Sequence, residues 1–520
     1  VEAIADGVQA FRYPKSRNAA TTLAIMAVLS ISMFLGISWL ARHTGVVFTE
    51  ETERIVVAQI ADAVFGEGPL FYLVAVMTAG ILILAANTAY QDFPRLSSIL
   101  AGDHFMPRQF LNRGDRLVFS NGVLILATLA SLLIIVFDAN LNSLIQLYLV
   151  GVFISFTLSQ TGMVLRWRRV GGPGWKARAA VNGFGAIVTG VVFFVIVTTK
   201  WSGGAWIVIA AIPVLIYMMH SIHRHYEDVA NQLALPERRP RDARPGHQHL
   251  VILVPRVDAA AARAVGYARS IRPEDIVAVA PDPELVGPWR TLAGEIPLQI
   301  LPSDGSTSKR LKTFLQQRRS DLAPTDFLSV VVPEVLQRRG LREIVSRPAM
   351  HRLKASLLIE EGVQVVDVPV VKETIDPQQD QSHEPARNYV CVLVSGVHNV
   401  TLHAIEFAET LRPTDLRAVT VGLDPEATER IGDEWLRAGI PHPLEIEDSP
   451  FRDIGRSLVG YVRQFRPDGL NRVVTVVIPE FVVGKRRHQL LHGQTALIVK
   501  RHLLFETGVV VASVPYHLEG

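Results

Sequence analysis

The chain has 520 residues, a formal net charge of +3 and a single cysteine, Cys391. One cysteine excludes an internal disulfide, and the balanced charge excludes the broad basic surface of a nucleic-acid-binding protein. Hydrophobic residues make up 49% of the chain and the mean hydropathy is +0.26, which is high for a soluble protein and low for one embedded entirely in a membrane. These values predict a chain with two different halves.

Long apolar runs dominate residues 1–225, which we expect to form an α-helical membrane bundle. The predicted spans lie at about 23–40, 70–89, 118–137, 148–167, 181–198 and 205–220. Basic loops at 12–17, 95–116, 166–178 and 223–225 fall on one side of these spans, and the acidic loop 42–67 falls on the other. Because basic loops prefer the cytoplasmic side, we expect a multi-pass protein of the cell membrane with residues 226–520 in the cytoplasm.

The span at 148–167 carries an unusual number of polar residues. It begins at Tyr148 and includes Thr157, Gln160 and Thr161. Polar groups inside a membrane tend to face a bundle interior or a substrate path. They can equally bond back to their own helix or join neighbouring helices, and for any single residue both interpretations remain open.

The second half contains a repeat. After a Pro- and Arg-rich linker at 226–248, HLVILVPRVDAAAARAVGYARSIRPEDIVAVAP at 249–281 is matched by YVCVLVSGVHNVTLHAIEFAETLRPTDLRAVTV at 389–421. FLSVVVPEV and EEGVQVVDVPV are likewise matched by VVTVVIPEF and ETGVVVASVPY. We therefore predict two copies of one α/β domain with a parallel sheet, at 249–388 and 389–520.

In open parallel sheets, ligands bind at the carboxyl ends of the strands. Those ends carry Pro333-Glu334 and Pro479-Glu480, and basic residues follow both pairs. The candidate nucleotide-binding residues are Arg256, Asp258, Arg338, Arg339, Ser395, His398, Arg486 and Arg487. The basic residues suit an anionic ligand, although a solvated face or a contact with lipid headgroups would use the same charges.

Several chemistries find no support in the sequence. Neither a phosphate-binding P-loop nor a Gly-x-Gly-x-x-Gly motif occurs. No pair of nucleophile and base stands out, so we assign no catalytic residue and predict that the chain is not an enzyme. We also expect no cofactor and no metal site.

Three membrane segments resemble the amino acid–polyamine–organocation (APC) superfamily, and within it the KimA-type potassium importers. They are VEAIADGVQAFRYPKSRNAA, TAYQDFPRLSSILAGDHFMPRQF and LIQLYLVGVFISFTLSQTGMVLRWRR. LLHGQTALIVKRHL resembles part of the cytoplasmic domain of these importers, which is similar to universal stress proteins. The resemblance implies a leucine-transporter-like inverted repeat of which residues 1–225 form the end of helix six to helix twelve, so the amino-terminal helices would be missing.

The resemblance also implies roles for individual residues. Glu2 matches an acidic residue near the ion path, Tyr148 matches a tyrosine that lines the path, and Asp6 is a weaker candidate. A membrane carboxylate can couple transport to protons because burial raises its pKa. The partners implied by the family are potassium, protons, cyclic di-AMP as an inhibitor, and a second copy of the chain in a homodimer.

We therefore carry three hypotheses forward. The leading one is a proton-coupled potassium importer that is regulated by a nucleotide second messenger at its cytoplasmic domain. The second is an amino acid permease of the same superfamily. The third, from another class, is a membrane-anchored nucleotide sensor that does not transport.

Overall fold

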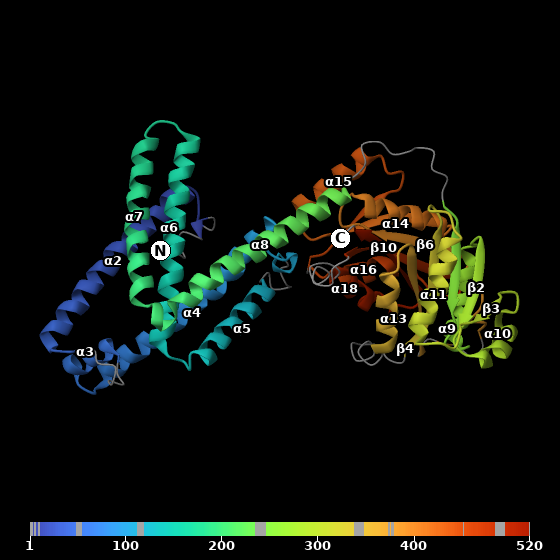
Figure 1. The fold of residues 1–520 in the computed structure, drawn as a ribbon, viewed down its shortest axis with the longest axis horizontal. Coiled ribbons are helices and arrows are strands. Elements are labelled where there is room, and N and C mark those ends of the chain that lie inside the picture. The colour runs from blue at the N-terminus through green and yellow to red at the C-terminus, as the bar shows by residue number, and fades with distance from the viewer. Residues whose placement is uncertain are drawn as a thin grey trace. The chain divides into compact units, whose positions relative to one another are not determined.

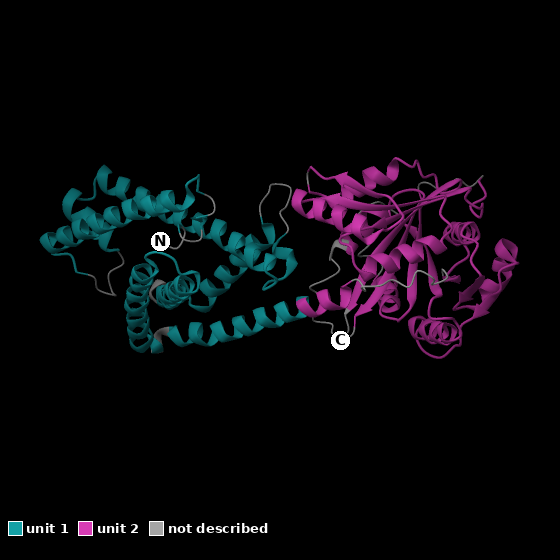
Figure 2. Cartoon of the chain, turned by 90° about the horizontal axis from the view of Figure 1, so that it is seen from above, with its two compact units in different colours: residues 1–226 teal, residues 227–520 magenta. Residues whose placement is uncertain are grey.

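The chain divides into two compact units, residues 1–226 and 227–520, which Figure 2 shows in teal and magenta. The helices and strands of each unit are labelled in Figure 1. The structure is a computed structural model that describes residues 4, 7–8, 11–47, 55–111, 119–234, 246–336, 348–372, 375, 379–450, 452–483 and 494–518.

The first unit is helical, as the apolar runs predicted. Its elements are α2 (Lys15–Thr44), α3 (Val56–Phe65), α4 (Pro69–Gly102), η2 (Arg108–Phe110), α5 (Ser120–Val136), α6 (Leu141–Val170), α7 (Trp175–Thr199), η3 (Trp201–Ala205) and α8 (Trp206–Leu233). Among the described residues, five helices are long and apolar enough to cross a membrane: α2, α4, α6, α7 and α8. The remaining predicted span, 118–137, corresponds to α5, whose 17 residues reach only about 26 Å at 1.5 Å per residue.

Helix α4 extends beyond the predicted span. We expected a basic loop at 95–116, but the helix continues through Pro94 to Gly102. Pro94 is buried against α5, where a Cβ added to Gly122 would lie 2.8 Å from the Pro94 Cα. The missing side chain of Gly122 therefore lets α5 approach the proline directly, and this contact supports the longer helix.

Helices α6 and α7 form a hairpin that is joined by polar side chains. Thr157 donates a hydrogen bond to the Thr189 hydroxyl at 3.0 Å, and the Asn182 amide donates to Gln160 Oε1 at 2.6 Å. Thr161 instead bonds back to the carbonyl of Thr157 within α6. Thr157 also lies 2.7 Å from the carbonyl oxygen of Phe153 in its own helix, so both interpretations of the polar residues in this span apply.

The second unit contains a ten-stranded sheet, which confirms the predicted α/β fold. Its strands are β1 (Gln248–Leu253), β2 (Asp275–Ala280), β3 (Leu298–Ile300), β4 (Phe327–Leu336), β5 (Val363–Val371), β6 (Arg387–Leu393), β7 (Asp415–Gly422), β8 (Leu444–Asp448), β9 (Arg472–Val483) and β10 (Val509–Leu518). The strand order is β3-β2-β1-β4-β5-β10-β9-β6-β7-β8. Each repeat thus contributes one half of the sheet.

Helices cover both faces of this sheet. The first repeat supplies α9 (Ala259–Ser270), η4 (Pro283–Leu285), α10 (Val286–Ala293), α11 (Thr307–Ser320) and α13 (Pro348–Leu358), and the second supplies α14 (Asn399–Thr410), α15 (Pro425–Ala438), α16 (Ile454–Arg463) and α18 (Gln494–Leu503). The core under α9, α10, α14 and α15 runs across both repeats. The core beneath α11 and α13 belongs to the first repeat, and the core beneath α16 and α18 belongs to the second repeat except for Leu336 of β4.

The repeats join through their last strands. All pairings within each repeat are parallel, but β5 and β10 pair antiparallel, with Val366 opposite Ala512. These two residues hold the same position in their repeats, so the halves are related by a pseudo-two-fold axis. Two copies of a parallel domain were expected. They form one continuous sheet because the last strand of each repeat is apolar and pairs its free backbone N–H and C=O groups with those of the other.

Side chains also cross between the repeats on the shared core face. The Tyr267 hydroxyl of α9 lies 3.2 Å from the Thr475 hydroxyl of β9. Thr410, at the end of α14, donates to Gln248 Oε1 at the start of β1 over 3.1 Å. The carboxyl-terminal ends of α9 and α14 therefore lie close to the pseudo-two-fold axis.

Candidate functional site

The predicted transport-path residues fall in the first unit. Tyr148 lies in the second turn of α6, and its side chain is 61% exposed among the described helices. Glu2 and Asp6 lie outside the described residues. All three assignments stay predictions.

Asp258 and His398 occupy the same position in the two repeats, and both begin a helix. Asp258 accepts hydrogen bonds from the backbone N–H groups of Ala260 and Ala261 at 3.0 and 3.1 Å, and so caps α9. His398 accepts one from the N–H of Thr401 at 3.3 Å and caps α14. Capping satisfies backbone donors that the first turn leaves free, which gives these two candidates a structural role.

Among the residues that the structure describes, the candidate residues of the two repeats lie apart. Because β5 and β10 are antiparallel, the carboxyl ends of the strands in one repeat lie at the opposite edge of the sheet from those in the other. Arg256 is exposed at one edge and Ser395 is exposed at the other. Arg338, Arg339, Arg486 and Arg487 lie outside the described residues. The structure thus offers two separate edges for binding and no single composite one.

The glutamate of each repeated Pro-Glu sequence forms an ion pair with a lysine. Glu334 accepts from the Lys354 ammonium group of α13 at 2.6 Å, and Asp367 of β5 lies 2.8 Å from the same nitrogen. Both carboxylate side chains are only 5% exposed. Burial alone would lower the pKa of Lys354, but the two carboxylates outweigh it and raise that pKa. Lys354 therefore stays charged and serves to hold β4, β5 and α13 together.

The second repeat carries a reduced version of this cluster. Lys500 of α18 pairs with Glu480, and Ser513 stands at the position of Asp367. Sequence reasoning did not identify either lysine. Each stands eight residues before the glycine that precedes the last strand of its repeat, Gly362 or Gly508. That shared spacing was the feature in the sequence that could have revealed the pair.

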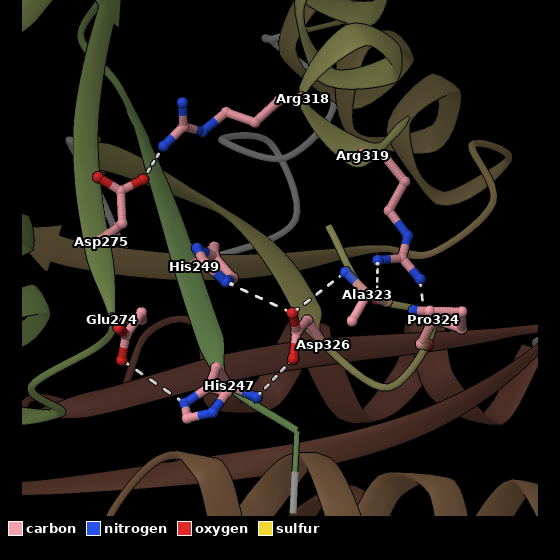
Figure 3. A network of polar contacts seen from close by, with 9 residues as sticks. All are labelled: His247, His249, Glu274, Asp275, Arg318, Arg319, Ala323, Pro324 and Asp326. Atoms are coloured by element: carbon pink, nitrogen blue, oxygen red, sulfur yellow. Dashed lines mark hydrogen bonds and ion pairs between the residues drawn. The ribbon is translucent and has the colours of Figure 1, made fainter. Parts of the chain in front are cut away.

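A second polar network closes the amino-terminal edge of the first repeat (Figure 3). Asp326 accepts from the backbone N–H of His247 at 2.9 Å and from that of Ala323 at 3.2 Å. The His249 ring lies 3.8 Å from the same carboxylate. Burial lowers the pKa of His249 and outweighs the opposing effect of Asp326.

This lowered pKa makes stability depend on pH. The unfolded chain binds a proton at His249 near pH 6.5, whereas the folded chain does so only at lower pH. The stability contributed by neutral His249 is therefore present above about pH 6.5 and is lost as the pH falls below it, by at most about 1.4 kcal/mol per pH unit for one proton. Chemical unfolding of residues 227–520 between pH 7.5 and 5 should show a smaller acid loss for His249→Gln than for the parent chain. His247→Gln, which removes an exposed ring from the same strand end, is the control; equal losses in the parent and His249→Gln would contradict the expectation.

Comparison with known proteins places both units in a family. Residues 10–219 match the amino acid permease family, and residues 246–370 and 386–516 match the family described as the KimA potassium transporter C-terminal domain. The chain belongs to the APC superfamily and carries the KimA-type carboxyl-terminal domain. The two matched parts of that domain correspond to the two repeats of the sheet.

One relative aligns with both units. The potassium transporter KimA of Bacillus subtilis (strain 168) is 33% identical over 379 residues, which cover 71% of this chain and 61% of the relative. The chain thus spans less than two thirds of that protein. The match, together with the apolar helices, identifies a multi-pass membrane protein with a soluble carboxyl-terminal domain. Membership in a transporter superfamily also confirms the prediction that the chain is not an enzyme.

Proposed function

We propose that this chain is the carboxyl-terminal portion of a proton-coupled potassium importer. The observation that carries the proposal is the alignment with a potassium transporter across 71% of the chain. In the proposal, residues 1–225 supply the end of helix six to helix twelve of the bundle. The basic loops support a cytoplasmic location for residues 226–520.

The proposed mechanism is alternating access around a site near the middle of the membrane. Glu2 would take up and release a proton, because a carboxylate in an apolar setting has its pKa raised toward the working range. Tyr148 would line the potassium path and offer its hydroxyl oxygen to the ion. A hard cation such as potassium is best matched by oxygen groups of this kind.

The test is potassium uptake by the natural protein in cells that lack their own potassium uptake systems. Uptake should rise as the external pH is lowered, and Tyr148→Phe should reduce it several-fold at equal protein abundance. Tyr217→Phe is the matched control, because Tyr217 is a tyrosine of another span and is 77% exposed. Uptake that does not change with the external pH would refute proton coupling. Unchanged uptake in Tyr148→Phe would show that Tyr148 does not line the path.

An amino acid permease is the second candidate, and the match of residues 10–219 to the amino acid permease family favours it. Labelled amino acids added to the same cells distinguish the two. Uptake of an amino acid without any potassium flux would replace the first proposal by the second.

We further propose that the second unit is a regulatory domain, similar to universal stress proteins, that binds cyclic di-AMP. The candidate residues at its two carboxyl-terminal strand edges support an anionic ligand. Because these edges lie apart, the proposal is one binding region per repeat and not a single shared one. Calorimetric titration of residues 227–520 with cyclic di-AMP, ATP and AMP tests it: selective tight binding of cyclic di-AMP is expected, and no binding of any nucleotide would leave the unit without this role.

A homodimer is part of the same proposal. The joining strands β5 and β10 already pair within one chain, so a second copy would have to bind elsewhere. Light scattering of the purified protein should give twice the mass of one chain. A mass of one chain at micromolar concentration would refute the dimer.

A further inference from the structure

A pocket lies at the junction of the two repeats, on the part of the second unit that the nucleotide proposal does not use. Its volume is about 420 Å³, which is within the range of pockets that hold small organic ligands. Ser270 and Arg272, from the end of α9, line it together with Arg412 and Thr414. The segment that enters β6, with Glu384 and Asn388, completes the polar lining.

The two arginines are equivalent residues. Each is the arginine of the repeated Arg-Pro-x-Asp sequence that follows the first helix of its repeat. The residues at the ends of α9 and α14 line the same pocket, and Thr410 at the end of α14 bonds to Gln248 at the start of β1. One pocket is therefore lined by one arginine from each repeat.

Other polar groups of the lining are already satisfied internally. Ser270 donates to the carbonyl of Tyr267, and the Thr414 hydroxyl accepts from the backbone N–H of Asn388. The Asn388 amide donates to the carbonyl of Leu411, and its oxygen accepts from Thr475. Recognition of a ligand in this pocket therefore depends mainly on the charged groups.

The carboxylates next to the two arginines in sequence contact other side chains. Figure 3 shows Glu274 beside the His247 ring, at 3.5 Å, and Asp275 paired with Arg318. In the second repeat, Asp415 lies 2.8 Å from Arg417. Among the described residues, neither Arg272 nor Arg412 has an ion pair, and the carboxylate lining the pocket is that of Glu384. The pocket thus keeps an excess of positive charge.

The backbone at both arginines is also unusual. Arg272 and Arg412 have φ angles of +43° and +48°, in the left-handed region that glycine or asparagine normally occupies after a helix. A side chain such as arginine is disfavoured in that region by its own Cβ. These φ angles decide which substitution can test the pocket, because asparagine tolerates the left-handed region.

We propose that this pocket binds a small ligand with two phosphate groups, held by Arg272 from one repeat and Arg412 from the other. A guanidinium group presents a planar fork of donors that matches two phosphate oxygens. Two forks related by the pseudo-two-fold axis match a ligand with two such groups. The assignment is independent of transport and of the nucleotide sites proposed at the carboxyl-terminal edges.

The experiment is calorimetric titration of the purified full chain with inorganic pyrophosphate, in magnesium-free buffer at fixed ionic strength. Orthophosphate is the single-phosphate probe and succinate is the dicarboxylate probe. The parent chain should bind pyrophosphate more tightly than either. The double variant Arg272→Asn, Arg412→Asn should weaken that binding at least tenfold, and because asparagine tolerates the left-handed backbone, its thermal stability should match or exceed that of the parent.

The matched control is Arg466→Asn. Arg466 is also exposed, precedes a proline and has a φ angle of +51°, but it does not line the pocket. This variant should keep the affinity of the parent for pyrophosphate. Equal affinities in all three chains would show attraction by general charge only and would overturn the proposal, as would the absence of pyrophosphate binding or a preference for succinate.

Discussion

Replacing Lys354 with methionine is expected to lower the free energy of unfolding of the second unit by about 3–5 kcal/mol. The change leaves the carboxylates of Glu334 and Asp367 buried without their shared cation, and each of these side chains is only 5% exposed. Denaturant unfolding of residues 227–520 measures the loss. Trp289 and Trp435 are the only tryptophans in that segment, and both are buried, so their fluorescence follows this unit alone.

The second repeat supplies the control for this prediction. Lys500→Met removes the equivalent lysine. It leaves a single carboxylate without its cation, that of Glu480, which is 15% exposed, because Ser513 stands in place of the second acid. The loss should therefore be smaller than for Lys354→Met. Combining Lys354→Met with Glu334→Gln and Asp367→Asn should recover much of the stability, since no unpaired charge then remains buried. Equal losses for the two lysines would show that the additional buried acid of the first repeat is energetically unimportant.

Adding one methyl group at Gly266 is expected to cost about 1–3 kcal/mol by overpacking. Gly266 lies in α9, where a new Cβ would be 2.3 Å from the carbonyl oxygen of His383. The segment between the repeats crosses the helix at this point. The equivalent residue of the second repeat is Glu406, whose side chain is exposed. Gly266→Ala should therefore displace the crossing segment, and the same fluorescence measurement reports the lost stability.

Gly460→Ala is the matched control for Gly266→Ala. Gly460 lies inside α16, and a Cβ placed there meets no atom within 4 Å. Alanine is the better helix former by about 1 kcal/mol, so this variant should be as stable as the parent or more so. If Gly266→Ala gained stability in the same way, the segment that crosses α9 would be able to move aside without a loss of folding free energy.

The sequence by itself determined the division into a membrane half and a soluble half, and also the duplication. Each depends on patterns that are local in the chain. A run of apolar residues as long as a bilayer is thick predicts a span wherever it occurs. Repeated segments such as HLVILVPR and YVCVLVSG reveal two copies without knowledge of their contacts. The length of α4 was not predicted correctly. Its extension is supported by the contact between Pro94 and Gly122, and Gly122 belongs to a second helix, α5.

Only the tertiary structure decided how the two copies meet. The antiparallel pairing of β5 with β10 places the carboxyl-terminal strand edges apart and brings the ends of α9 and α14 together. The tertiary structure also showed that Asp258 and His398 cap helices and that Glu334 forms an ion pair with Lys354. The strand pairing and the ion pair depend on residues that are separated in the chain, whereas the two caps are local contacts. A sequence pattern shows which side chains a strand or helix exposes, but the partner on the other side of the contact is fixed only when the elements pack.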